Sequence, residues 1–300
     1  MMTSGTLTLT QRNVLPLIWI TLREDAAAHD ITSRAVIPAG SRIRARIVAK
    51  STGILAGGPV AVWTFHAIDP SLRCLLKRCE GAVLAKGQTI LTIEGRARSI
   101  FAAERTALNF LVHLSGIATL THEFVQRARP FRAKILDTRK TLPGLRLLEK
   151  YAVRVGGGHS HRNNLEEAIL IKTNHLKVLC GMRNAECGMA IRTAIQNARQ
   201  RQPKKFVEIE VTNLDELRVA LHAHPDAVLL DNWSLPEIRK AVLLRNSARR
   251  TPHSALALEV SGGVTLANVW AIAKTGVDRI SIGRLTHSAP SLDLSLEVLS

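Results

Sequence analysis

Apolar residues recur with helical spacing at two places in the first part of the chain. Residues 11–28 place on one helical face the side chains of Val14, Leu15, Ile18, Trp19 and Leu22. Residues 99–129 predict a second, longer helix that breaks at Gly116 and ends before Pro130. Short strands are predicted between the two helices at 42–50, 72–79 and 89–94. We therefore expect an N-terminal domain that bears strands and ends in a long helix.

After Pro130, short apolar runs alternate with helical stretches. The apolar runs occupy 134–136, 168–171, 206–211, 227–230, 256–260 and 279–282. The helical stretches occupy 145–153, 185–201, 214–223, 236–245 and 266–275. This alternation predicts a parallel sheet with right-handed crossovers. It leaves open whether the sheet curls into a barrel or opens into a doubly wound sheet.

Composition and charge narrow the classes of function. The 300-residue chain is 46% hydrophobic and 22% charged, which excludes disordered, collagen-like and coiled-coil proteins. Its formal net charge of +17 indicates an anionic partner. On charge alone, that partner is either a nucleic acid or a small phosphorylated or carboxylated substrate. Aromatic residues make up only 4% of the chain, which disfavours a base-stacking surface for nucleic acid.

Cysteine spacing and apolar run length predict a cytoplasmic protein. The four cysteines form no Cys-x-x-Cys pair, so we expect reduced thiols at Cys74, Cys79, Cys180 and Cys187. The apolar run 14–22 is followed at once by Arg23, Glu24 and Asp25, which argues against an export signal. No apolar run approaches the roughly 20 residues of a membrane helix.

Charged residues and glycines follow nearly every strand predicted after Pro130. They are Asp137-Thr138-Arg139-Lys140, Lys172, Glu210, Asp231, Ser261-Gly262-Gly263 and Gly283. Parallel strands end on one face, and in α/β barrels that face holds the active site. The turns after the last two strands of such barrels commonly bind phosphate. We therefore expect these residues to share one edge of the sheet.

Each of these features also has a purely structural explanation. A glycine pair after a strand is often only a turn, and an acid such as Asp231 is often a helix N-cap. His159 and His161 could both ligate a metal, but the sequence shows no third ligand. As a set, the bases suit a substrate with several negative charges, and the acids suit sugar hydroxyls or Mg²⁺. The set predicts an anionic sugar polyphosphate that reacts with a second anionic substrate.

Ordered motifs extend along most of the chain. They are ERTALNFL at 104–111, LSGIAT at 114–119, DTRKT at 137–141, PGLR at 143–146, GGHSHR at 157–162, IK at 171–172, EIEV at 208–211, LDN at 230–232, EVSGG at 259–263 and GRLTHS at 283–288. In these motifs the chain resembles the carboxylating quinolinate phosphoribosyltransferases, also called nicotinate-nucleotide pyrophosphorylases. The resemblance implies an N-terminal open α/β sandwich plus a C-terminal incomplete parallel α/β barrel. It places the sandwich at 1–128 and the barrel at 129–287, with a tail at 288–300 that returns to the sandwich.

The resemblance also implies an activity and an assembly. Quinolinate and phosphoribosyl pyrophosphate would give nicotinate mononucleotide, pyrophosphate and CO₂, with Mg²⁺ as cofactor, in NAD biosynthesis. The protein would be a homodimer in which Arg105 enters the partner subunit's site, with no nucleic-acid or membrane partner. Related phosphoribosyltransferases that use nicotinate or serve molybdenum uptake share the scaffold and are the first alternative. A nucleic-acid-binding protein is the second.

Site residues follow from the same match. The implied catalytic residues are Lys140, Lys172, Glu210 and Asp231, of which Glu210 and Asp231 match positions beside the ribose and Mg²⁺. Residues matching the quinolinate-binding cluster are Arg105, Thr138, Arg139, Lys140, His161, Arg162 and Lys172. Residues matching the phosphate-binding turns are Ser261, Gly262, Gly263, Gly283, Arg284, Leu285 and His287. Three positions depart from the family pattern: Thr173 replaces an Asp, Asn164 a small residue and Arg284 an Ala. The missing acid at 173 bears on the local Mg²⁺ network.

Overall fold

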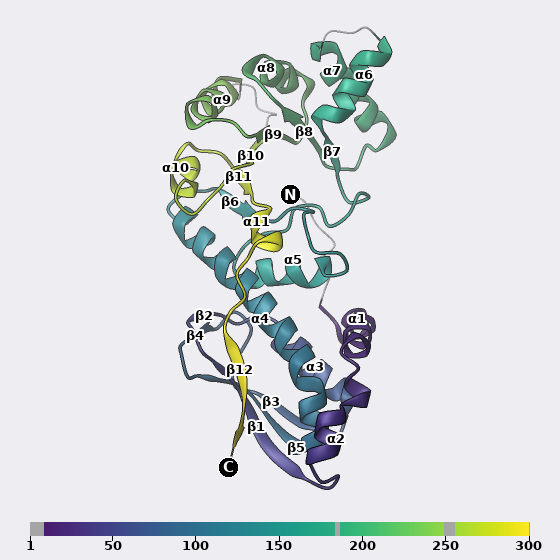
Figure 1. Ribbon diagram of the computed structural model, residues 1–300. Helices are drawn as coiled ribbons and strands as arrows, with labels where there is room; N and C mark the ends of the chain where they lie inside the picture. The colour runs from purple at the N-terminus through teal and green to yellow at the C-terminus, as the bar shows by residue number, and fades with distance from the viewer. Residues whose placement is uncertain (1–8, 184–186, 249–255, 300) are drawn as a thin grey trace. The chain divides into compact units, whose positions relative to one another are not determined.

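The computed structural model describes residues 9–183, 187–248 and 256–299 (Figure 1). These residues form two compact units. The N-terminal unit contains the described residues up to His122 together with Lys140–Gly157 and 284–299, and the C-terminal unit contains Glu123–Arg139 and Gly158–Gly283. The domain boundary predicted after residue 128 lies near His122, where the chain first passes from the N-terminal to the C-terminal unit. The return of Lys140–Gly157 to the N-terminal unit was not predicted.

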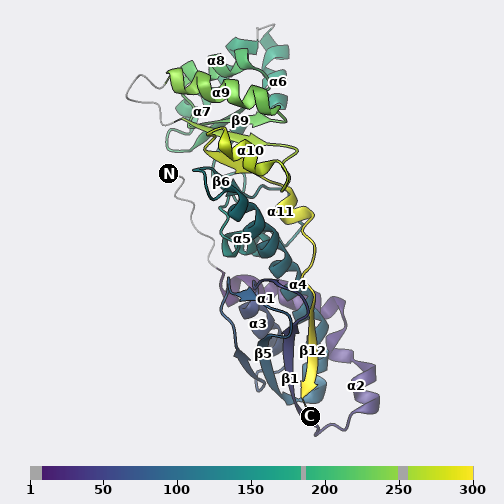
Figure 2. The same ribbon diagram turned by 90° about the vertical axis from the view of Figure 1, so that its left-hand side faces the viewer.

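An antiparallel sheet of four strands, in the order β12-β1-β5-β3, forms one layer of the N-terminal unit (Figure 2). Its strands are β1 Arg42–Ala49, β3 Arg73–Leu76, β5 Thr89–Arg96 and β12 Leu294–Leu299. A separate pair joins β2 Gly53–Ile54 to β4 Val83–Leu84. The register places Ile47 of β1 opposite Leu91 of β5 and Leu296 of β12. The strands predicted at 42–50, 72–79 and 89–94 are therefore confirmed.

Helices pack on this sheet to form the N-terminal core. The elements are α1 Gln11–Glu24, η1 Ala27–His29, α2 Ile31–Val36, α3 Gly58–Ile68, α4 Ala97–Ala128, α5 Arg146–Val155 and α11 Arg284–His287. Ile47 and Leu91 of the sheet, Phe65 of α3, and Ile100 and Leu111 of α4 belong to one buried cluster. Complete burial of such a side chain contributes roughly 1.5–3 kcal/mol relative to exposure. One face of the sheet is thus covered by helices, as an α/β sandwich requires.

Helix α4 is continuous through Gly116, so the predicted break there is wrong. A Cβ atom at this position would lie 2.1 Å from the carbonyl oxygen of Pro290. The glycine is needed because the C-terminal segment crosses the helix at this point, and it does not interrupt the helical hydrogen bonds.

A parallel sheet of six strands, in the order β6-β11-β10-β9-β8-β7, forms the C-terminal unit (Figure 1). Its strands are β6 Lys134–Leu136, β7 Ile169–Ile171, β8 Val207–Val211, β9 Ala227–Asp231, β10 Ala257–Ser261 and β11 Arg279–Ser281. Its helices are α6 Thr173–Arg183, α7 Cys187–Arg201, α8 Leu214–Ala223, α9 Leu235–Ala248 and α10 Val269–Lys274, and successive ones pack side by side. The predicted alternation is confirmed. Ala185, where one helix was predicted to begin, lies outside the described residues.

The strand order identifies an incomplete barrel. It is cyclic, because β7 to β11 follow in chain order and β6 lies beside β11, whereas a doubly wound sheet reverses direction near its centre. A parallel bridge between Leu136 and His159 adds one more extended segment on the far side of β6. Within the described residues no ladder joins that segment to β7. The predicted fold class is confirmed. No helix among the described residues is long and apolar enough to cross a membrane.

Candidate active site

The carboxyl ends of the parallel strands carry the predicted site residues of the C-terminal unit. Lys172 directly follows β7, Glu210 is the penultimate residue of β8, and Asp231 ends β9. In the register, Asp231 lies opposite Ser261 at the end of β10. Because β7, β8 and β9 are neighbours in the sheet, these ends share one edge, which confirms that expectation.

Thr173 holds the carboxylate of Glu210 in place. Its backbone N–H donates to Glu210 Oε1 over 3.2 Å, and its hydroxyl donates to the same oxygen. The residue that replaces the family's acid therefore binds an acid instead of adding a second one. Lys172 is the residue before Thr173, so the same contact fixes the backbone next to this exposed lysine.

Replacing Thr173 with valine is expected to lower kcat/KM about tenfold for the phosphoribosyl donor that the resemblance implies. The hydroxyl's hydrogen bond to a charged group is worth about 1.5 kcal/mol, and a tenfold change corresponds to about 1.4 kcal/mol. Steady-state kinetics of T173V check this. Thr212→Val is the matched control, since the exposed Thr212 bonds the side chain of Glu216. Equal kinetics for T173V and T212V would remove Thr173 from any role in the site.

Two partly or fully buried arginines, Arg139 and Arg162, follow the end of β6 and the segment beside it, and Arg139 Nε is buried without a hydrogen-bond partner among the described residues. Arg162 is only 7% exposed, and its Nη1 donates to the Ala168 carbonyl over 3.0 Å. Burial, and then the charge of the neighbouring Arg139, lower the pKa of Arg162. A bound anion would stabilise both cations, because it offsets the repulsion that lowers the pKa of Arg162. The pair suits a carboxylate with two oxygens to share.

Asp137 joins the two chain segments that carry these arginines. Its carboxylate is fully buried, and Oδ1 accepts the backbone N–H of His161 over 2.8 Å. Its own backbone N–H donates to the His159 carbonyl. Asp137 thus ties the end of β6, which leads to Arg139, to the segment that leads to Arg162.

His159, proposed as a metal ligand with His161, belongs to no cluster of metal-ligating side chains found in the described part of the chain.

The glycine turn after β10 has a backbone that other residues rarely adopt. Gly262 and Gly263 have φ of +85° and +59°. A Cβ at Gly262 would lie 2.2 Å from Oδ1 of Asn232, which directly follows the predicted catalytic Asp231. Asn268 closes the turn by donating to the Gly263 carbonyl over 2.9 Å. A compact turn with no side chain of its own beside Asp231 is suitable for the close approach of a phosphate.

Most of the remaining predicted residues belong to the N-terminal unit. Arg105 on α4 and the loop residue Lys140 are exposed. Thr286 of α11 donates its hydroxyl to the Lys140 carbonyl over 2.6 Å, which ties the segment of Arg284, Leu285 and His287 to the lysine. Leu285 is fully buried, so it offers only backbone groups to a ligand. Thr138 and Gly283 belong to the C-terminal unit, where both are half-buried, at residues where the chain leaves it.

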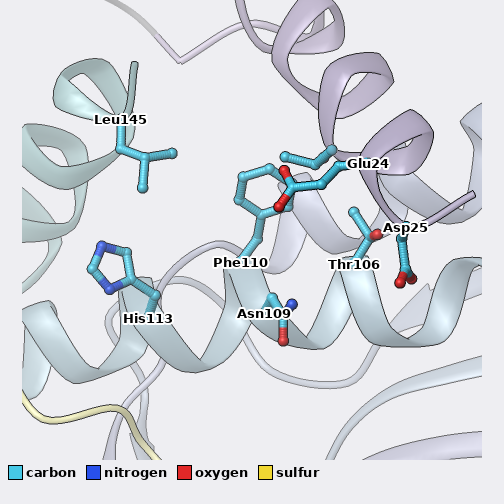
Figure 3. Close-up of a pocket in the computed structure, with 8 residues that line it drawn as sticks. Glu24, Asp25, Thr106, Asn109, Phe110, His113 and Leu145 are labelled. Atoms are coloured by element: carbon cyan, nitrogen blue, oxygen red, sulfur yellow. The ribbon is translucent and has the colours of Figure 1, made fainter. Parts of the chain in front are cut away.

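The N-terminal unit contains a pocket of about 400 Å³ (Figure 3). It is lined by Thr21, Glu24, Asp25, Thr106, Asn109, Phe110, His113 and Leu145. His113 Nε2 lies 3.0 Å from Glu149 Oε1, and the other oxygen of Glu149 accepts the Leu142 N–H over 3.2 Å. The buried Glu149 therefore connects the wall of this pocket to the loop that follows Lys140.

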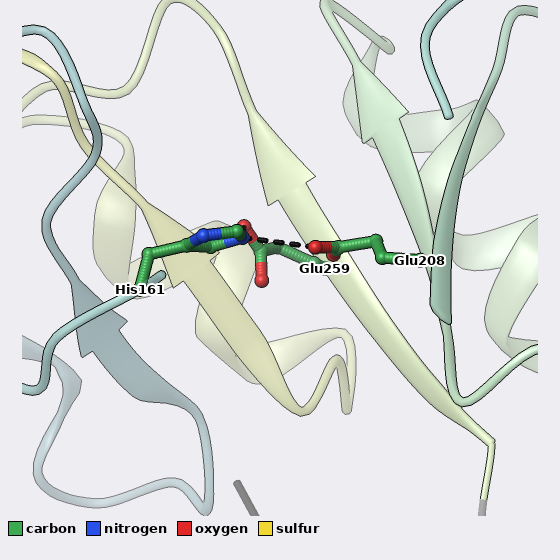
Figure 4. Close-up of side chains that lie close together, drawn as sticks. All are labelled: His161, Glu208 and Glu259. Atoms are coloured by element: carbon green, nitrogen blue, oxygen red, sulfur yellow. Dashed lines mark hydrogen bonds and ion pairs between the residues drawn. The ribbon is translucent and has the colours of Figure 1, made fainter. Parts of the chain in front are cut away.

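Sequence analysis missed a buried charged cluster between the strands. It consists of His161, Glu208 of β8, Glu259 of β10 and Arg279 of β11, and three of its members point toward one another in Figure 4. His161 Nε2 lies 2.9 Å from Glu208 and 3.5 Å from Glu259, and Arg279 Nε lies 2.7 Å from Glu259. The available signal was a charged residue inside two predicted strands, Glu208 and Glu259, and at the start of a third, Arg279, where a core normally has none.

The two acids of this cluster have different pKa values. Burial, and then the charge of Glu208, raise the pKa of Glu259 to about 7. Burial acts to raise the pKa of Glu208, but the interactions with His161 and then with Arg279 and Glu259 together lower it. Two carboxyl groups this close do not ionise together readily, so one of them keeps a proton near neutral pH.

The geometry defines an α/β enzyme that acts on anionic substrates at the open end of an incomplete barrel. The model of the quinolinate phosphoribosyl transferase N-terminal domain matches residues 30–115, and that of the C-terminal domain matches residues 117–297. A nicotinate-nucleotide pyrophosphorylase [carboxylating] of Mycobacterium leprae is 41% identical over 90% of this chain and 91% of its own. A probable nicotinate-nucleotide pyrophosphorylase [carboxylating] of Bacillus subtilis is 40% identical over 92% of this chain and 90% of its own.

A solved structure of a related protein has the same fold over nearly the whole chain. The nicotinate-nucleotide pyrophosphorylase from Francisella tularensis superposes with a TM-score of 0.88 at 37% identity, covering 99% of this chain and 100% of that one. The chain belongs to the quinolinate phosphoribosyl transferase family. The predicted family and enzyme class are therefore confirmed, and so is phosphoribosyl transfer to quinolinate in NAD biosynthesis.

Proposed function

We propose that quinolinate binds at the carboxyl edge of the C-terminal unit, where Arg139, Arg162 and Lys172 lie. The observation that carries this proposal is the buried Nε of Arg139, which has no hydrogen-bond partner among the described residues, together with the buried Arg162, whose pKa the charge of Arg139 helps to lower. Quinolinate has two neighbouring carboxylates, and each guanidinium can bind one with two parallel hydrogen bonds. Lys140, which directly follows Arg139 in the chain, and Arg105 are proposed as further quinolinate-binding residues.

Glu210 and Asp231 are proposed to act on the ribose. As the C1′–O bond to pyrophosphate breaks and the bond to the pyridine nitrogen forms, positive charge develops on the sugar ring. Fixed carboxylates stabilise that charge directly and through the ring hydroxyls. Glu210 is suited to this because Thr173 restricts its carboxylate, and Asp231 lies on the adjacent strand.

Decarboxylation needs no further cofactor. Once ribosylated, the pyridine nitrogen is cationic, so it stabilises the electron pair left at C2 when the bond to the adjacent carboxylate breaks. CO₂ leaves, and C2 then takes a proton to give nicotinate mononucleotide. Lys140 and Lys172 are proposed to orient the reacting carboxylate and the pyrophosphate, as compact cations with three donors each.

Mg²⁺ is proposed as the cofactor, with Glu210 and Asp231 as its protein contacts. Both are carboxylates at the ends of adjacent strands, and in the described residues they are not part of a larger ligand cluster. Two carboxylates fit Mg²⁺, which usually keeps several waters and takes its other ligands from a substrate phosphate. When bound, the ion would neutralise the leaving pyrophosphate.

We further propose a cytoplasmic homodimer in which Arg105 of one subunit reaches the partner's site. The exposure of Arg105 on α4 is compatible with that role. The charge of +17 is then assigned to anionic substrates, with no nucleic-acid or membrane partner. Light scattering together with mixing of inactive R105A and K172A subunits tests the dimer, since hybrid dimers would regain one complete site.

Replacement of Arg139 by glutamine is expected to raise the KM for quinolinate by about 10- to 100-fold. A charge-assisted bidentate contact to a carboxylate is worth about 1.5–3 kcal/mol. The assay measures nicotinate mononucleotide and labelled CO₂ from carboxyl-labelled quinolinate, with nicotinate in its place as the test for the sister activity. Arg132→Gln, at an exposed arginine on the preceding segment, is the matched control. Unchanged KM in R139Q, or product from nicotinate, would contradict the proposed site.

A further inference from the structure

The interior of the barrel contains a histidine whose two ring nitrogens are both engaged by protein groups. His161 is 6% exposed. Nε2 lies 2.9 Å from Glu208 Oε2, and Nδ1 accepts the backbone N–H of Arg162 over 2.8 Å. Both ring nitrogens thus contact protein groups. The residue directly after His161 is Arg162, whose buried guanidinium belongs to the proposed quinolinate site.

These contacts fix the tautomer of the ring. Although burial disfavours the imidazolium, Glu259 and Glu208 raise the pKa of His161. A second ring proton would have to sit on Nδ1, and that atom already faces the Arg162 N–H donor. In this arrangement Nδ1 serves as an acceptor, and the ring hydrogen lies on Nε2, directed at Glu208.

We propose that Glu208 is a positioning residue for quinolinate binding, which acts by holding His161 as the Nε2–H tautomer so that Nδ1 can anchor the backbone of Arg162. This inference rests on the proposed site. It assigns His161 an indirect role, because the ring orients Arg162 instead of touching the substrate. Asp137, which accepts the His161 N–H over 2.8 Å, fixes the backbone on the other side of the ring.

A metal ion is a second use for His161, Glu208 and Glu259, whose ligand atoms all lie within 4.8 Å of one another. The position of Arg279 makes a metal ion at these three residues unfavourable. Its guanidinium Nε is 2.7 Å from Glu259 Oε2, and its side chain is only 10% exposed. A resident cation already balances the acids, so a divalent ion would have to enter beside it. The geometry favours a hydrogen-bonded positioning network.

Two substitutions of Glu208 test the proposal. Glu208→Gln keeps an oxygen acceptor for Nε2–H, whereas Glu208→Leu removes it at similar volume. We expect E208Q to keep the quinolinate KM within about threefold of the wild type. We expect E208L to raise that KM about tenfold or more while the KM for phosphoribosyl pyrophosphate stays constant. Exposed Glu123→Gln on α4 is the matched control.

Histidine ¹H–¹⁵N correlation spectra give a readout that a merely structural role would not change. In the wild type and E208Q, His161 should show the Nε2–H tautomer, with the signal assigned by its loss in H161Q. In E208L that signal should change. A wild-type His161 protonated on both nitrogens, a metal co-purifying in stoichiometric amount, or an E208L protein with unchanged tautomer and KM would each overturn the proposal. If E208L does not fold, an E208Q protein with a raised quinolinate KM and an unchanged tautomer would also overturn it.

The test separates this inference from the proposed site. If R139Q leaves quinolinate binding unchanged, the site itself is wrong. If R139Q weakens binding and E208L does not, the site stands and only the positioning role of Glu208 fails.

Discussion

Replacing Arg279 with methionine is expected to lower the free energy of unfolding by about 3–5 kcal/mol, the usual cost of removing one partner from a buried ion pair. Arg279 is the only cation that the described contacts place against Glu259, and both side chains are buried. Its guanidinium also lies over the ring of Phe206, 5.3 Å from its centre. Without it, two buried carboxylates face each other with only His161 beside them. Urea denaturation followed by circular dichroism measures the change.

The loss should depend on pH in a defined direction. The pKa of Glu259, about 7 in the folded protein, lies above its value in the unfolded chain, so the folded state holds the extra proton. The stability that this group contributes is present at low pH and falls as pH rises from about 4.5 to 7. In R279M the ionised Glu259 has no cation beside it, so the destabilisation should be larger at pH 8 than at pH 6.

An exposed arginine provides the control for this experiment. Arg218 pairs with Asp215 on the surface of α8, and both side chains are more than half exposed. Arg218→Met should change stability by at most about 0.5 kcal/mol, because solvent screens such pairs. Equal losses in R279M and R218M, or a loss in R279M that shrinks as pH rises, would contradict the assigned role of Arg279.

Replacing Lys172 with alanine is expected to lower kcat by at least about a hundredfold with little change in stability. Lys172 is exposed and directly follows β7, so its removal leaves no cavity in the core. Removal of one fixed donor or charge that acts on developing negative charge typically costs about 10²–10³ in rate. Single-turnover formation of nicotinate mononucleotide, compared with thermal unfolding of the same sample, separates the two effects.

Lys177→Ala supplies a matched variant, since Lys177 is an exposed lysine on the same helix, α6. K177A should turn over at the wild-type rate. Activity of K172A close to that of K177A would exclude Lys172 from the chemistry and leave Lys140 as the lysine to examine.

The spacing of apolar residues predicted helices and strands well where one face of the helix or strand is exposed to solvent. Residues 42–50 alternate arginine with apolar residues, and β1 has that pattern because one face of the sheet is covered by helices. It failed for α3, whose residues are apolar on nearly every side and show no helical period. It also misplaced a break at Gly116, because sequence cannot show that the Pro290 carbonyl occupies the space of a Cβ.

The amino-acid sequence by itself determined where the parallel strands end and which residues follow them. A charged residue after a short apolar run marks the point where a strand leaves the core, and parallel pairing then brings Lys172, Glu210 and Asp231 to one edge. Only the tertiary structure decided which charges meet inside the barrel. The strand register places Arg279 of β11 opposite Glu259 of β10, and the fold brings Glu208 of β8 and Glu259 into contact with His161 from a separate segment, which no local pattern encodes.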